Sequence, residues 1–120
     1  MTRVLIVDDE PLFAEALDLI LSADERIEVV GKARDGRQAV ALAKELEPDV
    51  ILMDLSMPGM DGFAAIAAIV EADADQRIVV LSGSADPDDV ERAKRAGACA
   101  YLTKERIADD LVPQVIKAAG

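Results

Sequence analysis

The chain has 120 residues, of which 52% are apolar, so it can form one domain with its own core and is not expected to be disordered. Its formal net charge of −11 at pH 7 argues against nucleic-acid binding by this segment, because contacts to phosphates need a basic surface. The sequence contains no histidine, which excludes His-ligated zinc, Ser-His-Asp catalysis and phosphohistidine chemistry on this chain.

The first quarter of the chain predicts a strand, a helix and a second strand. Residues 4–7 form a continuous apolar run of strand length. Residues 11–22 place apolar side chains at helical spacing and begin with proline, which is favoured at the first position of a helix. Residues 27–33 are rich in isoleucine and valine, but Glu28 and Lys32 interrupt the run, so this strand is expected at an edge of the sheet.

The middle of the chain predicts a helix, a central strand and another helix. Asp35 and Gln38 have the spacing of a capping box, and the helix that they begin is ended by Pro48. Residues 50–53 are apolar on both faces of a strand and therefore predict a central position in the sheet. After a loop, a helix rich in alanine and isoleucine is expected at about 62–72.

The C-terminal part predicts two further pairs of strand and helix. Strands are expected at 77–82 and 98–103, with a helix at about 87–96 between them and a last helix at about 109–119. Pro113 is expected in or near the first turn of that last helix, since proline deeper in a helix breaks its hydrogen-bond ladder. Five strands that alternate with five helices predict an α/β fold with a parallel sheet covered on both faces.

Cys99 is the only cysteine, so no internal disulfide can form, which fits a reducing compartment. It lies in the apolar stretch AGACAYL and is expected to be a buried structural thiol. No apolar run approaches the length of a membrane span, and the N-terminus lacks the pattern of a signal peptide, so a cytoplasmic protein is expected.

Polar side chains terminate four of the five predicted strands. Asp8 and Asp9 follow the first strand, Asp54 the third, Ser82 the fourth and Lys104 the fifth. Because the carboxyl ends of parallel strands meet at one edge of the sheet, these side chains are expected in a single cleft. Each residue alone would more often be a solvated loop residue, but five such groups at strand ends favour a common site.

These groups fit phosphoryl transfer assisted by a hard cation. Three clustered carboxylates repel one another, and Mg²⁺ or Mn²⁺ would relieve that repulsion through oxygen ligands. A carboxylate can itself be the nucleophile and form an acyl phosphate, with Lys104 and Ser82 contacting the phosphoryl oxygens. We expect Asp54 to be the acceptor because it stands alone at the end of the central strand, whereas Asp8 and Asp9 are better suited to hold metal.

Two further features of the sequence, Glu10 and the helix at about 87–96, are interpreted without a direct role in binding the cation. Glu10 is interpreted as a favourable charge at the start of the first helix rather than a metal ligand. The helix at about 87–96 has few and small apolar anchors, chiefly Val90, Ala93 and Ala96. Little apolar burial implies a low free energy of local opening, so the amides of this helix are expected to be less protected than those of the first helix.

Four sequence elements carry a resemblance that covers the whole chain, in the order VLIVDDE, PDVILMDLSMPGMDG, IVVLSGS and AGACAYLTK. They resemble the receiver domains of bacterial two-component response regulators, and their style is similar to the NarL/FixJ type, which carries a helix-turn-helix output domain. The resemblance implies that residues 1–120 form one receiver domain with a CheY-like, flavodoxin-like (βα)5 fold and strand order 2-1-3-4-5. It also implies a phosphorylation-dependent signalling switch that is not an enzyme beyond weak self-phosphorylation from small donors and self-dephosphorylation.

The resemblance also implies a role for each site residue. The acceptor of a phosphoryl group from a sensor kinase histidine would be Asp54. The ligands of Mg²⁺ (or Mn²⁺) would be Asp8, Asp9, Asp54 and the backbone carbonyl of Ser56. The residues in contact with the phosphoryl group would be Lys104, Ser82 and Gly83. The residues that shift together as a switch would be Ser82 and Tyr101, and those that tune phosphoryl lifetime would be Ser56 and Ser84.

The partners that the resemblance implies are a sensor histidine kinase or phosphotransfer protein as donor, and an output domain or effector protein as receiver of the signal. Regulation of transcription is one expected output. The signal would pass through a changed surface formed by the fourth helix, fifth strand and fifth helix, and a homodimer that forms on phosphorylation is compatible with it. Neither direct nucleic-acid binding by this segment nor a membrane partner is expected.

Four alternatives share part of the pattern. A haloacid-dehalogenase-type phosphatase needs a second aspartate two residues after the nucleophile, where this chain has Ser56. A cobalamin-binding module needs histidine in its D-x-H-x-x-G loop, where DLSMPG has serine. An FMN-binding flavodoxin needs a phosphate loop rich in glycine and hydroxyl residues, where this chain has DDE. A degenerate receiver that serves only as an interaction module is the strongest rival, although every expected site residue is present.

Overall fold

A computed structural model describes residues 1–55, 62–83 and 86–120 of the chain. Its strands are β1 (Thr2–Val7), β2 (Ile27–Ala33), β3 (Val50–Asp54), β4 (Arg77–Ser82) and β5 (Ala100–Thr103). Its helices are α1 (Pro11–Ser22), α2 (Gly36–Leu46), α3 (Gly62–Ala72), α4 (Pro87–Ala96) and α5 (Ile107–Ala119), with a 3₁₀ turn η1 (Lys104–Arg106) before α5. Each predicted element is present, and its bounds differ from the prediction by two residues at most.

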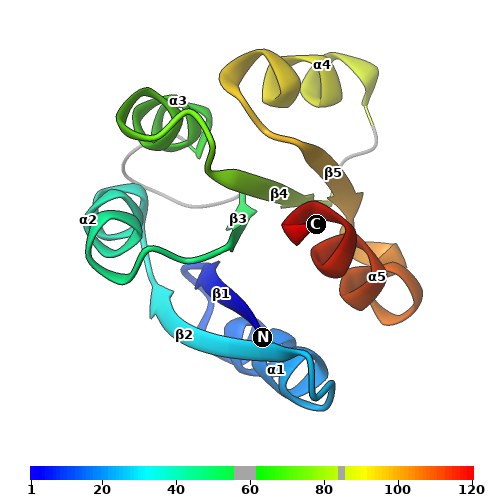
Figure 1. The fold of residues 1–120 in the computed structure, drawn as a ribbon. Coiled ribbons are helices and arrows are strands. Elements are labelled where there is room, and N and C mark those ends of the chain that lie inside the picture. The colour runs from blue at the N-terminus through cyan, green and yellow to red at the C-terminus, as the bar shows by residue number, and fades with distance from the viewer. Residues whose placement is uncertain (56–61, 84–85) are drawn as a thin grey trace.

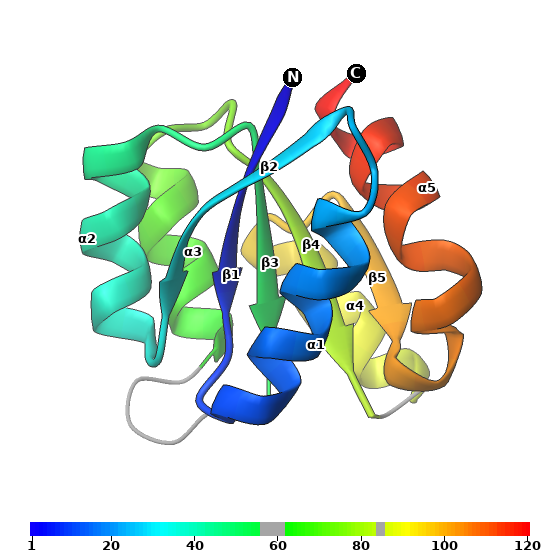
Figure 2. The same ribbon diagram turned by 90° about the horizontal axis from the view of Figure 1, so that it is seen from below.

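The five strands form one parallel sheet in the order β2-β1-β3-β4-β5, which confirms the predicted topology (Figure 2). Every residue of β3 is buried, as expected of the central strand of such a sheet. The predicted edge strand β2 does lie at an edge and has exposed or half-buried residues along most of its length. From β1 the chain passes first to β2 on one side and then to β3 on the other side, so the strand order changes direction at β1. The α/β folds bind ligands at such a point, here at the carboxyl ends of β1 and β3.

Two hydrophobic cores lie on opposite faces of the sheet. Figure 1 shows α1 and α5 on one side of the sheet and α2, α3 and α4 on the other. The first core joins the sheet to Leu17 and Leu21 of α1 and to Leu111 of α5. The second joins it to Ile66 of α3 and Ala93 of α4, among others. Among the helices that the structure describes, none is long and apolar enough to cross a membrane.

The helix α4 is held by little apolar burial, as the sequence predicted. Ala93 is its only buried residue, and Val90 and Ala96 are half-buried. The helix ends at Gly97, whose φ of 123° is a conformation that L side chains rarely adopt. A Cβ at this glycine would also lie 2.7 Å from Cγ2 of Val70 on α3. The end of α4 is therefore fixed by a close contact that only glycine allows.

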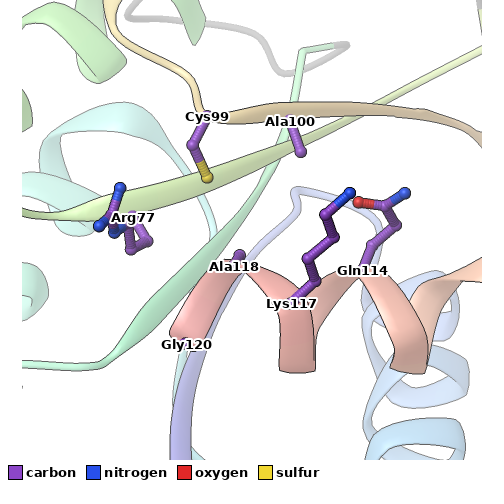
Figure 3. A pocket seen from close by; sticks show the side chains of 7 residues that line it. All are labelled: Arg77, Cys99, Ala100, Gln114, Lys117, Ala118 and Gly120. Atoms are coloured by element: carbon purple, nitrogen blue, oxygen red, sulfur yellow. The ribbon is translucent and has the colours of Figure 1, made fainter.

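Two predictions about the C-terminal part were wrong. Pro113 lies inside α5 beyond its first turn, because the helix begins at Ile107, two residues earlier than expected, where the Ile107 side chain is buried in the core. Cys99 is exposed rather than buried. It precedes β5 at the amino end of the sheet, where it lines a pocket of about 230 Å³ with Arg77 of β4 and Lys117 of α5 (Figure 3).

The caps observed at the starts of α2 and α1 agree with those expected from the sequence. The Asp35 carboxylate accepts the N–H of Gln38 at 2.8 Å, as the capping box predicted. The Gln38 side chain differs slightly, since it accepts the N–H of Arg34, one residue before the cap, at 2.7 Å. At the start of α1, Glu10 caps the helix by accepting the N–H of Leu12 at 3.2 Å, and Pro11 occupies the first turn.

Candidate functional site

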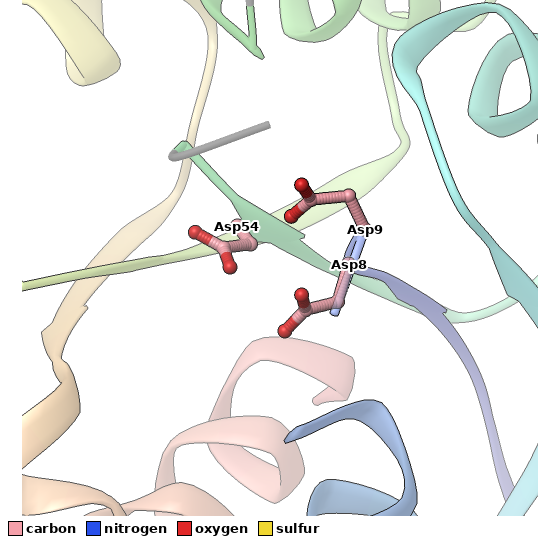
Figure 4. Close-up of side chains that lie close together, drawn as sticks. All are labelled: Asp8, Asp9 and Asp54. Atoms are coloured by element: carbon pink, nitrogen blue, oxygen red, sulfur yellow. The ribbon is translucent and has the colours of Figure 1, made fainter. Parts of the chain in front are cut away.

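Three carboxylates lie close together at the carboxyl ends of β1 and β3. Asp8 and Asp9 follow β1, Asp54 ends β3, and the parallel register pairs Val7 with Met53, which brings the two strand ends level. One oxygen from each carboxylate lies within 4.8 Å of the others. Figure 4 shows Asp8 and Asp9 on one side of this group and Asp54 on the other. The structure thus brings together the acidic residues that the sequence placed in one cleft.

Asp8 is a buried carboxylate, and its two oxygens differ in hydrogen bonding within the described residues. The residue is 3% exposed, and its Oδ1 accepts the backbone N–H of Glu10 at 2.8 Å. Its Oδ2 is buried and has no hydrogen-bond partner in the part of the chain that the structure describes. Burial raises the pKa of Asp8 from 3.8 to about 6; the bond from Glu10 opposes this, and the nearby Asp54 carboxylate adds to it.

Lys104 supplies the positive charge of the site. Its Nζ donates to Oδ2 of Asp54 at 3.0 Å, and Asp54 is 2% exposed. Because β4 lies between β3 and β5, the lysine side chain crosses one strand to make this contact. The same ammonium lies 4.7 Å from the centroid of the Phe13 ring on α1. Phe13 is one of the apolar side chains whose spacing predicted the helix at residues 11–22, and that spacing says nothing about Lys104.

The remaining predicted site residues differ in their burial. Ser82 ends β4 beside β3 and is buried. Gly83 is exposed, and a Cβ there would meet no atom of the described residues within 4 Å. Tyr101 is half-buried in β5 and packs against the core on the α3 and α4 side of the sheet. Ser56 and Ser84 lie outside the described residues. The predicted site residues at the ends of β1, β3, β4 and β5 thus lie along one edge of the parallel sheet.

The donor set fits a hard divalent cation. Mg²⁺ and Mn²⁺ prefer oxygen ligands, and the Asp8, Asp9 and Asp54 carboxylates converge as such a set. The buried Oδ2 of Asp8, which has no partner among the described residues, is the atom that a cation would satisfy most directly. Glu10 is not a member of the group, because its side chain caps α1. This agrees with its interpretation as a residue of the helix start.

Comparisons with known proteins agree with the fold. The family model for the response regulator receiver domain matches residues 4–116. The transcriptional regulatory protein LiaR of Bacillus subtilis is 44% identical over 120 residues, which are 100% of this chain and 56% of LiaR. The nitrate/nitrite response regulator protein NarL of Escherichia coli is 39% identical over 117 residues, which are 98% of this chain and 54% of NarL.

A solved receiver-domain structure has the same fold as this chain. The signal receiver domain of the putative response regulator NarL from Mycobacterium tuberculosis superposes with a TM-score of 0.93 at 37% identity, covering 98% of this chain and 95% of that one. The chain spans about half the length of the curated relatives it matches. Fold, acidic cleft and sequence similarity lead to one conclusion: the chain belongs to the family of response regulator receiver domains.

Proposed function

We propose that this receiver domain is a phosphorylation-dependent switch that accepts a phosphoryl group on Asp54. The observation that carries the proposal is the surroundings of this carboxylate. It is almost fully buried, its Oδ2 accepts a bond from the Lys104 ammonium at 3.0 Å, and it lies within 4.8 Å of oxygens from Asp8 and Asp9. A structural ion pair needs one carboxylate and one cation, whereas two additional buried or half-buried carboxylates cost free energy unless they bind something.

In the proposed reaction, a carboxylate oxygen of Asp54 attacks phosphorus in line with the bond to the donor. The new O–P bond forms an acyl phosphate as the P–N bond to a donor histidine breaks, and the bonding electrons return to the imidazole. Lys104 is suited to stabilise the charge on the phosphoryl oxygens because its ammonium already lies at the acceptor. Ser82 and Gly83, at the end of β4, are the proposed further contacts of the phosphoryl group.

A divalent cation completes the proposed site. When bound, Mg²⁺ (or Mn²⁺) would neutralise charge on the acceptor and on the phosphoryl group. The proposed ligands are Asp8, Asp9, Asp54 and the backbone carbonyl of Ser56. The residues proposed to tune the lifetime of the acyl phosphate are Ser56 and Ser84. The Oδ2 of Asp8, which lacks a partner within the described part of the chain, supports the assignment of Asp8 as a ligand.

The proposed signal is a change of the surface formed by α4, β5 and α5. Ser82 and Tyr101 are the proposed switch residues, since one is buried at the end of β4 and the other half-buried in the neighbouring β5. The weak anchoring of α4, with Ala93 alone buried, supports a helix that moves at low energetic cost. Formation of a homodimer through a changed surface is a further proposal.

The proposed partners follow from the family. A sensor histidine kinase or phosphotransfer protein in the cytoplasm would donate the phosphoryl group, and an output domain or effector protein would receive the signal. The two curated relatives described above are a transcriptional regulatory protein and a response regulator, and this chain covers about half of each. Regulation of transcription is therefore the proposed output, with the receiver itself acting as a switch rather than an enzyme.

Intact mass spectrometry tests the proposal. The protein is incubated with acetyl phosphate and Mg²⁺, and one added phosphoryl group is expected on the parent and none on Asp54→Asn. Asp75→Asn is the matched control, and it should be modified like the parent. Asp75 is an exposed aspartate that precedes β4, at the opposite edge of the sheet from the carboxyl ends of the strands. A parent that remains unmodified with acetyl phosphate and with a cognate kinase would favour a receiver that acts only as an interaction module.

A further inference from the structure

The contact between Lys104 and Phe13 has no role in the proposed function. The ammonium lies 4.7 Å from the centroid of the ring, which is the geometry of a cation–π interaction. We propose that Phe13 is a positioning residue whose ring holds the Lys104 ammonium against Oδ2 of Asp54. The inference rests on the proposed function, in which Lys104 contacts the incoming phosphoryl group, and it adds a residue of α1 to that site.

Phe13 is suited to act as a rigid platform. It lies in the first turn of α1, whose start is fixed by the Glu10 cap and by Pro11. The ring is half-buried and packs against the core that α1 and α5 share with the sheet. A packed aromatic ring has few accessible rotamers, so its face presents a constant surface to the lysine.

The Lys104 side chain benefits from such a platform because it spans from the end of β5 to the acceptor at the end of β3. The residue opens the 3₁₀ turn after β5, and its side chain reaches across β4 to the end of β3. A lysine stem is long and flexible, so many of its rotamers would not place the ammonium on Asp54. The side chain is 30% exposed, which leaves water as a competitor for the charge. A fixed ring beside the ammonium reduces the number of competing positions.

The neighbouring charges make this restraint important for the reaction. Asp8 and Asp9 attract the ammonium as Asp54 does, since one oxygen from each of the three carboxylates lies within 4.8 Å of the others. An ammonium drawn among all three carboxylates would occupy the space where a divalent cation is expected. The negative face of the Phe13 ring attracts the ammonium from the α1 side instead. The result is a lysine that contacts the acceptor and leaves the other carboxylates available.

Kinetics of phosphorylation test the inference. With acetyl phosphate at saturating Mg²⁺, Phe13→Leu is expected to phosphorylate about three- to tenfold more slowly, as an interaction of this type is worth. Phe13→Tyr keeps the aromatic face and should stay within about twofold of the parent. Ile20→Ala is the matched control, because Ile20 packs against the same core from the C-terminal part of α1, whereas Phe13 lies in its first turn.

A double-mutant cycle separates positioning from general packing. In a Lys104→Ala background, Phe13→Leu should have no further effect on the rate, since the residue through which it acts is absent. A loss of the same size in both backgrounds would overturn the inference, because it would show that the ring acts through packing alone. Equal rates for the parent and Phe13→Leu would overturn it as well.

A measurement without phosphodonor keeps this test independent of the proposed function. Stacking on a ring face shifts the NMR resonances of the Lys104 ε-methylene protons upfield, and this shift should disappear in Phe13→Leu and persist in Phe13→Tyr. Resonances that do not change between the parent and Phe13→Leu would overturn the inference. If the shift behaves as expected but the parent is never phosphorylated, the proposed function fails and the positioning of Lys104 stands.

Discussion

Substitution of Asp8 by asparagine is predicted to stabilise the metal-free protein at neutral pH. The change keeps the oxygen that accepts the N–H of Glu10 and removes the charge of a residue that is 3% exposed. It also replaces Oδ2, which has no partner in residues 1–55, 62–83 and 86–120, by an amide nitrogen that can donate to the neighbouring Asp54 carboxylate. The substituted side chain is therefore better satisfied in the absence of metal than the native one.

The size of the expected gain in unfolding free energy follows from the pKa of Asp8, which burial and the Asp54 charge raise from 3.8 to about 6. A carboxyl with a raised pKa in the folded state favours folding below its unfolded pKa and loses that contribution as the pH rises through the folded pKa. This loss of folding stability begins near pH 4 and is complete somewhat above pH 6. At neutral pH the charged Asp8 therefore costs about 3 kcal/mol of unfolding free energy, since the pKa is raised by about two units and each unit corresponds to about 1.4 kcal/mol.

Urea unfolding in the presence of a chelator measures this effect. At about pH 7.5, Asp8→Asn should be more stable than the parent by about 1–3 kcal/mol, and at about pH 5 the difference should fall by about half. Saturating Mg²⁺ should stabilise the parent more than the variant, because ligand binding to the native state adds to its stability. A variant that is less stable than the parent at about pH 7.5 without metal would refute the reasoning.

The remaining predictions concern elements around the site. In hydrogen exchange, amides of α4 should be less protected than those of α1, and equal protection would contradict the weak anchoring of α4. Gly97→Ala should lower the unfolding free energy by about 1–3 kcal/mol, because its Cβ meets Val70 in a left-handed conformation; an unchanged thermal midpoint would be inconsistent with that contact. Asp35→Ala should cost about 1 kcal/mol through loss of the bond from Gln38, whereas Asp35→Asn, which keeps the acceptor, should cost much less in the same assay.

The fold was predictable because local patterns and tertiary burial agree along most of the chain. Continuous apolar runs became the buried strands, and the run at 50–53 became the central one. Prediction failed where a tertiary contact overrides a local rule. Burial of Ile107 extends α5 toward its N-terminus and leaves Pro113 inside the helix, and the open amino end of the sheet leaves Cys99 exposed despite its apolar neighbours.

The candidate site was predictable to the extent that topology alone assembles it. In a parallel sheet any side chain at the carboxyl end of a strand lies on the same edge, so Asp8, Asp54 and Lys104 could be grouped without coordinates. Phe13 could not be added in this way, because its approach to Lys104 depends on how α1 packs across the sheet. Contacts made by helix side chains depend on packing angles, which the spacing of apolar residues does not define.

The exposed thiol of Cys99 gives this protein a natural point of attachment for a spectroscopic probe. It is the only cysteine of the chain, so a maleimide dye would label a single position without any substitution. The label would stand at the amino end of the sheet, in the pocket that Lys117 of α5 helps to line, and thus at the opposite end from Asp54. A fluorophore there would report the proposed change of the α5 surface in real time while Asp8, Asp9 and Asp54 stay chemically untouched.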